Sequence, residues 1–141
     1  MNTYSTKKED INPKWILIDA KDQVIGRLAT KISRILTGKD NIKFVKNLSM
    51  GDKVIVINSD QLKFTGSKMA QKKYHRHSGF AGGHVERTAD YYMKKDSTFL
   101  LKHAVSGMLP KNKMRDVMLK NLRIFKDNKH KHEAQLKEIV N

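Results

Sequence analysis

The chain has 141 residues, with 29 Lys or Arg against 14 Asp or Glu, which gives a formal net charge of +15 and an isoelectric point near 10.0. Such a charge repels itself in a compact state and favours a polyanionic partner, of which nucleic acid is the leading candidate. The absence of cysteine excludes disulfides, thiol catalysis and cysteine-type zinc sites, and no apolar run approaches the roughly 20 residues that a membrane span needs.

The length fits one domain of ordinary size. We expect a polar N-terminal extension over residues 1–13, a single α/β domain over residues 14–126 and a charged C-terminal tail over residues 127–141. The extension carries acids and no apolar core, so it does not resemble a signal peptide. Together with the lack of cysteine, this favours a cytoplasmic protein without membrane contact.

The first half of the chain predicts strands around one helix. The short apolar run 15–18 is typical of a strand buried on both faces. Apolar residues from Ile25 to Leu36 fall on one helical face, and Gly38 ends this helix. Residues 54–57 form a second buried strand, and residues 62–65 a short third one. The order strand–helix–strand implies a right-handed parallel βαβ unit.

Helices dominate the second half. Thr88 is suited to cap a helix that runs toward Lys95, and Ser97 to cap another that ends before Pro110. A third helix fits residues 113–122, and residues 122–125 alternate like an edge strand. The whole pattern indicates an α/β domain.

The clearest candidate for nucleic-acid binding is the acid-free stretch 67–85, which holds the cations Lys68, Lys72, Lys73 and Arg76. Lys68 and Lys72 are one helical turn apart and can share a face. Tyr74 and Phe80 stand among the cations, and RNA-binding proteins use this mixture because cations neutralise phosphates while rings stack on bases. Gly79, Gly82 and Gly83 let a backbone approach a phosphate closely. The alternative is a solvated basic loop, against which the charge of the whole chain argues.

Two further basic regions are candidates. Residues 111–132 contain eight Lys or Arg against two Asp, and Lys111, Asn112, Lys113 and Arg115 follow Pro110 at an expected helix start, where free N–H groups favour anions. The face of the first helix that carries Arg27, Lys31 and Arg34 is the third candidate. In both regions the alternative is an ordinary solvated helix surface.

Metal binding is not predicted. The pairs His75/His77 and His130/His132 have the spacing of paired ligands. However, no carboxylate or thiolate stands near the first pair in the sequence, and both pairs lie in cationic surroundings that repel a metal ion. Neutral imidazoles that stack on RNA or bond to it explain these histidines better.

Catalysis is not predicted either. The glycine-rich segment 79–83 lacks the Lys-Ser/Thr that completes a phosphate-binding P-loop. Single aspartates, namely Asp19, Asp22, Asp52 and Asp60, stand near strand ends, where they suit turns and caps better than a two-metal nuclease site. We therefore expect no cofactor and no small-molecule substrate.

Several motifs resemble those of a known family. They include Lys14-Trp15, Ile18-Asp19-Ala20, residues 24–29, Gly51-Asp52 and residues 54–58. Residues 74–83 are similar to the family's Tyr-Tyr-Arg-His-Ser-Gly-Tyr-Pro-Gly-Gly, and residues 104–113 match its central signature almost residue for residue. From about residue 12 to about residue 135, in order and spacing, the chain resembles the bacterial large-subunit ribosomal protein family L-thirteen.

The resemblance implies an α/β fold with three layers, α/β/α, around a short, mainly parallel central sheet, plus basic loops and tails. It also implies a non-enzymatic constituent of the large ribosomal subunit that binds large-subunit rRNA, supports early subunit assembly and contacts neighbouring ribosomal proteins. The positions that carry over as RNA contacts are Arg27, Lys31, Lys68, Lys72, Lys73, Tyr74, Arg76, His77, Ser78, Gly79, Gly82, Gly83, Lys111, Asn112, Lys113 and Arg115.

Two departures from the family pattern bear on these contacts. Ala81 stands where the family has Pro, so the glycine loop is expected to be less stiff before RNA binds. Arg115 lies in Met114-Arg115-Asp116, where Leu-Gly-Arg is common in the family, so this arginine is shifted by one place.

Two other functions stay open at this point. One is a metal-dependent nuclease that uses an Asp cluster, which turnover of RNA with Mg²⁺ or Mn²⁺ would reveal. The other is an RNA-binding regulator of translation that acts away from the ribosome, which cosedimentation with large subunits would distinguish from a ribosomal constituent.

Overall fold

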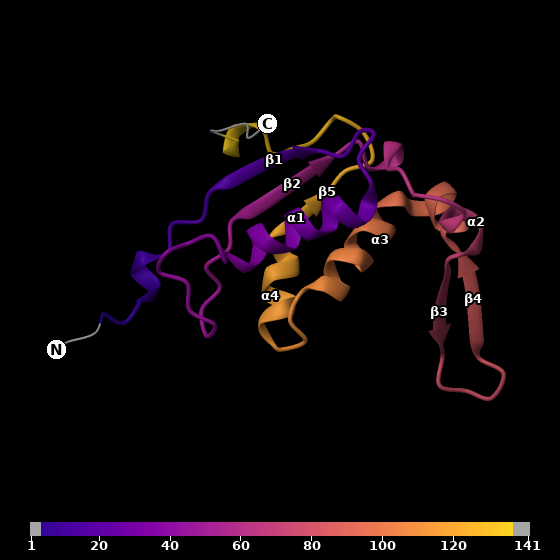
Figure 1. Cartoon of the computed structure of the whole chain (residues 1–141), viewed down its shortest axis with the longest axis horizontal. Coiled ribbons are helices and arrows are strands. Elements are labelled where there is room, and N and C mark those ends of the chain that lie inside the picture. Colours follow the sequence, from indigo (N-terminus) through magenta and orange to yellow (C-terminus); the bar gives the residue numbers. More distant parts are fainter. Residues whose placement is uncertain (1–3, 137–141) are drawn as a thin grey trace.

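A three-stranded parallel sheet lies at the centre of the fold, in the order β1-β2-β5. Its strands are β1 (Trp15–Asp19), β2 (Lys53–Ile57) and β5 (Leu122–Ile124), as Figure 1 shows for this computed structural model, which describes residues 4–136. The middle position suits β2 because its apolar residues from Val54 to Ile57 are all buried, as a strand covered on both faces requires. Helix α1 lies between β1 and β2 in the sequence, and the two strands pair in parallel. This confirms the predicted parallel βαβ order.

Helix α1 (Ile25–Thr37) begins and ends where its apolar spacing predicts. Leu28, Ile32 and Leu36 are fully buried along one side of it. Gly38 follows in the left-handed conformation with φ of 73°, and a Cβ atom there would lie 2.6 Å from the backbone oxygen of Met50. Only glycine meets both conditions without strain.

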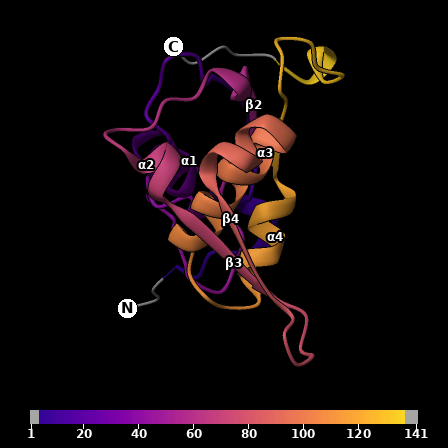
Figure 2. The same cartoon turned by 90° about the vertical axis from the view of Figure 1, so that its right-hand side faces the viewer.

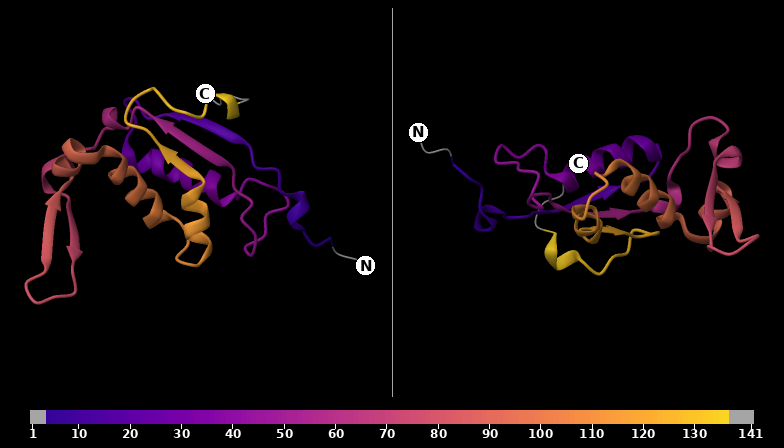
Figure 3. Two further views of the ribbon diagram at one scale, coloured as in Figure 1. Left: turned by 180° about the vertical axis from the view of Figure 1, so that it is seen from behind. Right: turned by 90° about the horizontal axis from the view of Figure 1, so that it is seen from below.

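The helices cover one face of the sheet. α1, α3 (Ala89–Met108) and α4 (Met114–Lys120) lie together on this side in Figure 1 and in the views of Figure 3. Val54 and Val56 point into the core that these helices close. None of the helices within residues 4–136 is long and apolar enough to cross a membrane.

The C-terminal segment, residues 125–136, covers the other face of the sheet (Figure 1). The buried side chains of Ile55 and Ile57 lie on this face, because side chains alternate along β2. The ring of His132 stacks on Trp15 with 5.6 Å between centroids, and the backbone N–H of Ser59 donates to the carbonyl oxygen of Phe125 at 3.2 Å. This layer contains one short 3-10 helix, η3 (Glu133–Gln135). The predicted α/β fold with a short, parallel central sheet is confirmed.

Helix α2 (Lys68–Gln71) leads into an antiparallel hairpin of β3 (Lys73–His77) and β4 (His84–Thr88). The hairpin projects well beyond the helical side of the molecule (Figures 1 and 2). The sequence predicts a basic glycine loop here but not the strands on either side of it. The strands escape prediction because each carries a single apolar side chain, Tyr74 in β3 and Val85 in β4, which is too few to show a period-2 pattern.

Helix α3 confirms one predicted cap and corrects another. The side chain of Thr88 accepts the backbone N–H of Tyr91 at 3.4 Å, as expected for an N-cap. The helix then kinks at Asp96, whose φ and ψ of −156° and 94° are not helical and whose Oδ1 accepts the N–H of Thr98 at 3.2 Å. Asp96 is therefore the internal cap, and the predicted cap Ser97 is instead buried.

The predicted strand at residues 62–65 does not form. Lys63 makes a single isolated bridge to Val24, and no ladder extends from it. The segment is held between the 3-10 turn η2 (Ser59–Gln61) and Gly66, which has a φ of 60°. Too few extended residues remain between these turns for a strand.

Candidate nucleic-acid interface

Alternation of side chains along β3 and β4 gives the hairpin two different faces. The inner face, toward α3, carries Tyr74, Arg76, Val85 and Arg87. The outer face carries Lys73, His75, His77, His84 and Glu86.

Tyr74 anchors the inner face to the body of the molecule. Its ring is only 7% exposed and packs edge-on against Tyr92, Phe99 and His103, with centroids 5.2 to 5.9 Å away. A ring enclosed in this aromatic cluster cannot stack on a base, so the structure does not favour the stacking role that the sequence suggests for Tyr74. Lys72 lies above the same ring, with Nζ 5.5 Å from its centroid.

A cleft of about 460 Å³ separates the rest of the inner face from the first half of α3. We call it the hairpin cleft, and its main lining residues are Arg76, Arg87, Tyr91, Tyr92, Lys95 and Phe99. Arg87 and Lys95 both lie over the Tyr91 ring, at 5.1 and 5.8 Å from its centroid. Cations held against aromatic faces can meet a phosphate and stack on a base, so the cleft suits a nucleotide strand.

The loop between the strands presents a backbone and one ring to solvent. Gly79 and Gly82 have φ of 87° and 71°, which only glycine adopts readily. The N–H of Gly79 donates to Nδ1 of His77 at 2.9 Å, and the N–H of Ser78 donates to the carbonyl of Gly83 at 3.2 Å. Phe80 at the tip is 78% exposed, which makes it the ring available for stacking in place of Tyr74.

On the outer face, the Glu86 carboxylate contacts two polar side chains of the opposite strand. Lys73 Nζ donates to Oε2 of Glu86 at 2.9 Å, and His75 Nδ1 lies 3.3 Å from Oε1. The hydrogen bond from Lys73 holds the pKa of the Glu86 carboxyl below its ordinary value. No carboxylate stands near His75 in the local sequence. Pairing of β3 with β4 nevertheless brings Glu86 to it, because His75 and Glu86 are directly opposite in register.

Lys68 and Lys72 meet the first turn of α1. They line a hollow of about 380 Å³ together with Gly26 and Phe64. The N-terminal end of a helix carries a partial positive charge, so this hollow favours an anionic group between the two lysines. Arg27 is exposed on the same turn of α1 and is not among the residues that line the hollow.

The remaining predicted cations lie elsewhere. Lys111, Asn112 and Lys113 are exposed at the turn between α3 and α4, a second tip on the helical side (Figure 1), whereas Arg115 is half-buried in the first turn of α4. On α1, Lys31 is exposed, and Arg34, one turn further on, donates to Asp40 at 2.7 Å.

The four aspartates considered for a nuclease site each have a structural partner. Asp19 Oδ1 accepts Asn58 Nδ2 at 2.8 Å, Asp22 pairs with Lys63 at 2.7 Å, Asp52 Oδ1 accepts the N–H of Lys14 at 2.9 Å, and Asp60 accepts the hydroxyl of Ser97. Within residues 4–136, no group of three aspartates converges on a common point. Asp19 Oδ1 also accepts the N–H of Lys21 at 2.9 Å, which fits the predicted turn role, whereas the other three aspartates join segments that are distant in the sequence.

The fold and this surface define a small, strongly basic α/β protein with a projecting cationic hairpin. A family model described as Ribosomal protein L13 matches residues 13–131, so the chain belongs to the ribosomal protein L13 family. As a member of a family of ribosomal proteins, it is not an enzyme.

Curated relatives match over almost the whole chain. The chain is 42% identical over 140 residues to "Large ribosomal subunit protein uL13" of Maridesulfovibrio salexigens, which covers 99% of both chains. It is 44% identical over 135 residues to the protein of the same name from Lawsonia intracellularis, covering 96% of this chain and 94% of the relative. The relative from Mycoplasmopsis synoviae is 43% identical over 133 residues.

Sequence reasoning missed several members of the hairpin cleft. Arg87, Tyr91 and Lys95 lie outside the acid-free stretch, and only the pairing of β3 with β4 and the packing of α3 bring them to Arg76. The one available signal was the recurrence of cations and tyrosines between residues 87 and 95.

Proposed function

We propose that this protein is a structural constituent of the large ribosomal subunit that binds large-subunit rRNA and supports the early assembly of the subunit. Its other partners are neighbouring large-subunit ribosomal proteins. The names of its relatives, each a "Large ribosomal subunit protein uL13", support this assignment. The single observation that carries the RNA-binding part is the hairpin cleft, where arginines and a lysine line aromatic walls on a projecting element.

The proposed contacts fall into three groups. The hairpin supplies Arg76, His77, Ser78, Gly79, Gly82 and Gly83 from the predicted set, with Arg87, Tyr91, Lys95 and Phe80 added. The hollow beside α1 supplies Lys68 and Lys72, and the exposed surface of α1 supplies Arg27 and Lys31. The second tip supplies Lys111, Asn112, Lys113 and Arg115. Lys73 contributes least, because Glu86 already holds its ammonium group.

The chemistry of these groups favours recognition of RNA backbone and shape. Cations meet phosphates, which position a protein without reading sequence. Tyr91 under two cations and Phe80 at the tip offer rings to unpaired bases, which folded RNA presents in loops and bulges.

Salt-dependent RNA binding tests the proposal. We expect the affinity of the full chain for a large-subunit rRNA fragment to fall linearly in log–log form with salt, because each phosphate contact releases counterions. The triple variant Lys72→Ala, Arg76→Ala, Arg87→Ala should lose about ten-fold or more in affinity and reduce the slope by about 2. The matched control, Lys8→Ala, Lys21→Ala, Lys129→Ala, removes three exposed charges away from the hairpin. Equal losses of RNA affinity in the triple variant and in the control would contradict the assignment of RNA binding to the hairpin and Lys72.

A further inference from the structure

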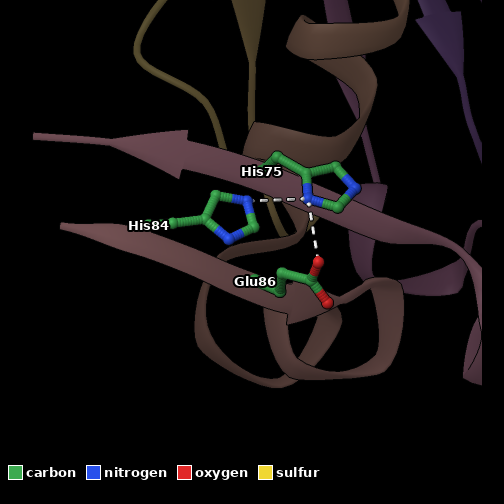
Figure 4. Close-up of side chains that lie close together, drawn as sticks. All are labelled: His75, His84 and Glu86. Atoms are coloured by element: carbon green, nitrogen blue, oxygen red, sulfur yellow. Dashed lines mark hydrogen bonds and ion pairs between the residues drawn. The ribbon is translucent and has the colours of Figure 1, made fainter. Parts of the chain in front are cut away.

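Three side chains on the outer face of the hairpin bring their ligand atoms together, as Figure 4 shows. His75 Nδ1 lies 3.2 Å from His84 Nε2 and 3.3 Å from Glu86 Oε1. One ligand atom from each residue lies within 4.8 Å of the other two, and all three side chains are exposed. The cluster combines two strands, since His75 comes from β3 and the other two residues come from β4.

These spacings match those that a tetrahedral metal ion imposes on its ligands. Zinc binds imidazole nitrogen and carboxylate oxygen at roughly 2.0–2.2 Å, which places neighbouring ligand atoms about 3.3–3.5 Å apart around a tetrahedron. The contacts of His75 with His84 and with Glu86 are within about 0.2 Å of that edge. A small inward movement of exposed side chains would complete the third edge.

Hydrogen bonding alone satisfies this cluster poorly. Nδ1 of a neutral His75 carries either one proton or one lone pair, yet it faces both a carboxylate oxygen and a ring nitrogen at hydrogen-bond distance. A single proton on Nδ1 would have to be shared between Glu86 and His84 in a weaker three-centre bond. A metal ion accepts a lone pair from all three atoms at once.

The surroundings hold the ligands in place. Lys73 occupies Oε2 of Glu86 at 2.9 Å, which orients the carboxylate and leaves Oε1 facing the imidazoles. The rings of His75 and His84 are parallel within 10°, at 5.4 Å between centroids. The ammonium of Lys73 repels a cation, but solvent screens this repulsion at an exposed site, so it weakens binding without preventing it.

We propose that His75, His84 and Glu86 form a binding site for a divalent transition-metal ion of the zinc class. Two imidazoles and one carboxylate favour zinc, nickel or copper over magnesium or calcium, which prefer oxygen ligands alone. Three protein ligands leave at least one coordination position open to solvent. The bound ion would join β3 to β4 and stiffen the hairpin. The site lies on the face opposite the hairpin cleft, so it does not depend on RNA binding.

Calorimetric titration of the full chain with Zn²⁺, in the absence of RNA and with Mg²⁺ as the comparison ion, tests the site. We expect one equivalent of Zn²⁺ to bind saturably and Mg²⁺ not to compete. His84→Ala and Glu86→Gln should each weaken Zn²⁺ binding ten-fold or more. His130→Ala, which removes a histidine from the C-terminal segment, should change it less than two-fold and controls for general imidazole binding.

Hydrogen exchange provides an independent readout. Because a metal ion that joins the strands stabilises them, Zn²⁺ should slow the exchange of amides in residues 73–88 of the wild type and leave them unchanged in His84→Ala. The proposal is overturned if Zn²⁺ does not bind saturably, if His84→Ala binds as tightly as the wild type, or if the protected amides lie outside the hairpin.

Discussion

Tyr74 and His75 are neighbours in the chain, yet they point to opposite faces of the hairpin. The Tyr74 ring is enclosed by the aromatic residues of α3, whereas His75 is exposed beside Glu86. The same alternation sends Arg76 into the hairpin cleft and His77 to the outer face. Residues that form one basic stretch in the sequence therefore separate into an anchor, a proposed RNA contact and a proposed metal site.

Phe80 tests base stacking at the tip of the hairpin. Phe80→Ala should weaken binding to an rRNA fragment by about 1–3 kcal/mol, because a stacked base is lost, and should leave the slope of log affinity against log salt unchanged. Phe80→Trp should keep the affinity, since a larger ring still stacks. Filter binding over a salt series measures both quantities, and an affinity unchanged by Phe80→Ala would exclude stacking at this position.

Gly51 and Gly107 form a matched pair for stability. A Cβ atom on Gly51 would lie 1.8 Å from the backbone oxygen of Leu36, so Gly51→Ala must displace the end of α1 and should cost about 3 kcal/mol. A Cβ atom on Gly107 in α3 would meet no other atom within 4 Å. Because glycine loses more backbone freedom in a helix than alanine does, Gly107→Ala should stabilise the protein by roughly 0.5–1 kcal/mol. Urea denaturation measures both values. A Gly51→Ala protein as stable as the wild type would show that this contact is not tight.

At this scale the sequence could predict which residue types the site uses but not their partners. The cations Lys68, Lys72 and Arg76 stand out from charge alone. By contrast, Tyr74 looks like a stacking residue in the sequence, and only its packing shows that it is an anchor. The contact between His75 and Glu86 depends on strand register, which no local pattern around the histidine contains.

The hairpin is joined to the body mainly through α3. Tyr74 contacts Tyr92 and Phe99 of that helix, and the chain passes directly from β4 into α3 at Thr88. The kink at Asp96 divides α3 into a first half that carries the cleft and a second half that packs in the core through Leu100, Leu101 and Val105. The cleft thus lies at the edge of the molecule, and α3 continues from it into the core.

The anchoring role of Tyr74 predicts a paired result. Tyr74→Ala removes a buried ring and should reduce the free energy of unfolding by roughly 3 kcal/mol, with faster hydrogen exchange throughout β3 and β4. Tyr74→Phe keeps the ring and should stay within about 1 kcal/mol of the wild type. Denaturation and exchange measurements on the two variants decide the matter, and normal protection of the hairpin in Tyr74→Ala would contradict this role.

The more deeply a helix or strand is buried, the better its limits could be predicted from the sequence. α1 and β2 have strong apolar patterns because they pack against the core, and their predicted limits agree with the structure within a residue or so. β3 and β4 have one apolar side chain each, Tyr74 and Val85, among polar ones, so their pattern is indistinguishable from a loop. Long-range pairing, rather than local preference, forms these two strands.

Across the whole molecule, the structural core and the proposed RNA-binding elements lie in different parts of the fold. The parallel sheet and its apolar core lie on one side, while the hairpin and the turn between α3 and α4 project from the helical side (Figures 1 and 3). The net charge of +15 provides long-range attraction to a polyanion, and the projecting elements supply the geometry. Family membership makes this protein a ribosomal protein of the L13 family, and the hairpin cleft is the surface that we propose to face the RNA.

Cosedimentation in sucrose gradients tests the central claim most directly, because it asks whether the hairpin holds the protein in the large subunit. Extracts of cells that produce either the full chain or the Lys72→Ala, Arg76→Ala, Arg87→Ala variant would be fractionated and probed for the protein. We predict that the wild type and the Lys8→Ala, Lys21→Ala, Lys129→Ala control sediment with large subunits, while the hairpin variant moves substantially to the top of the gradient. A wild-type protein found only at the top, or a hairpin variant that sediments like the wild type, would contradict the account.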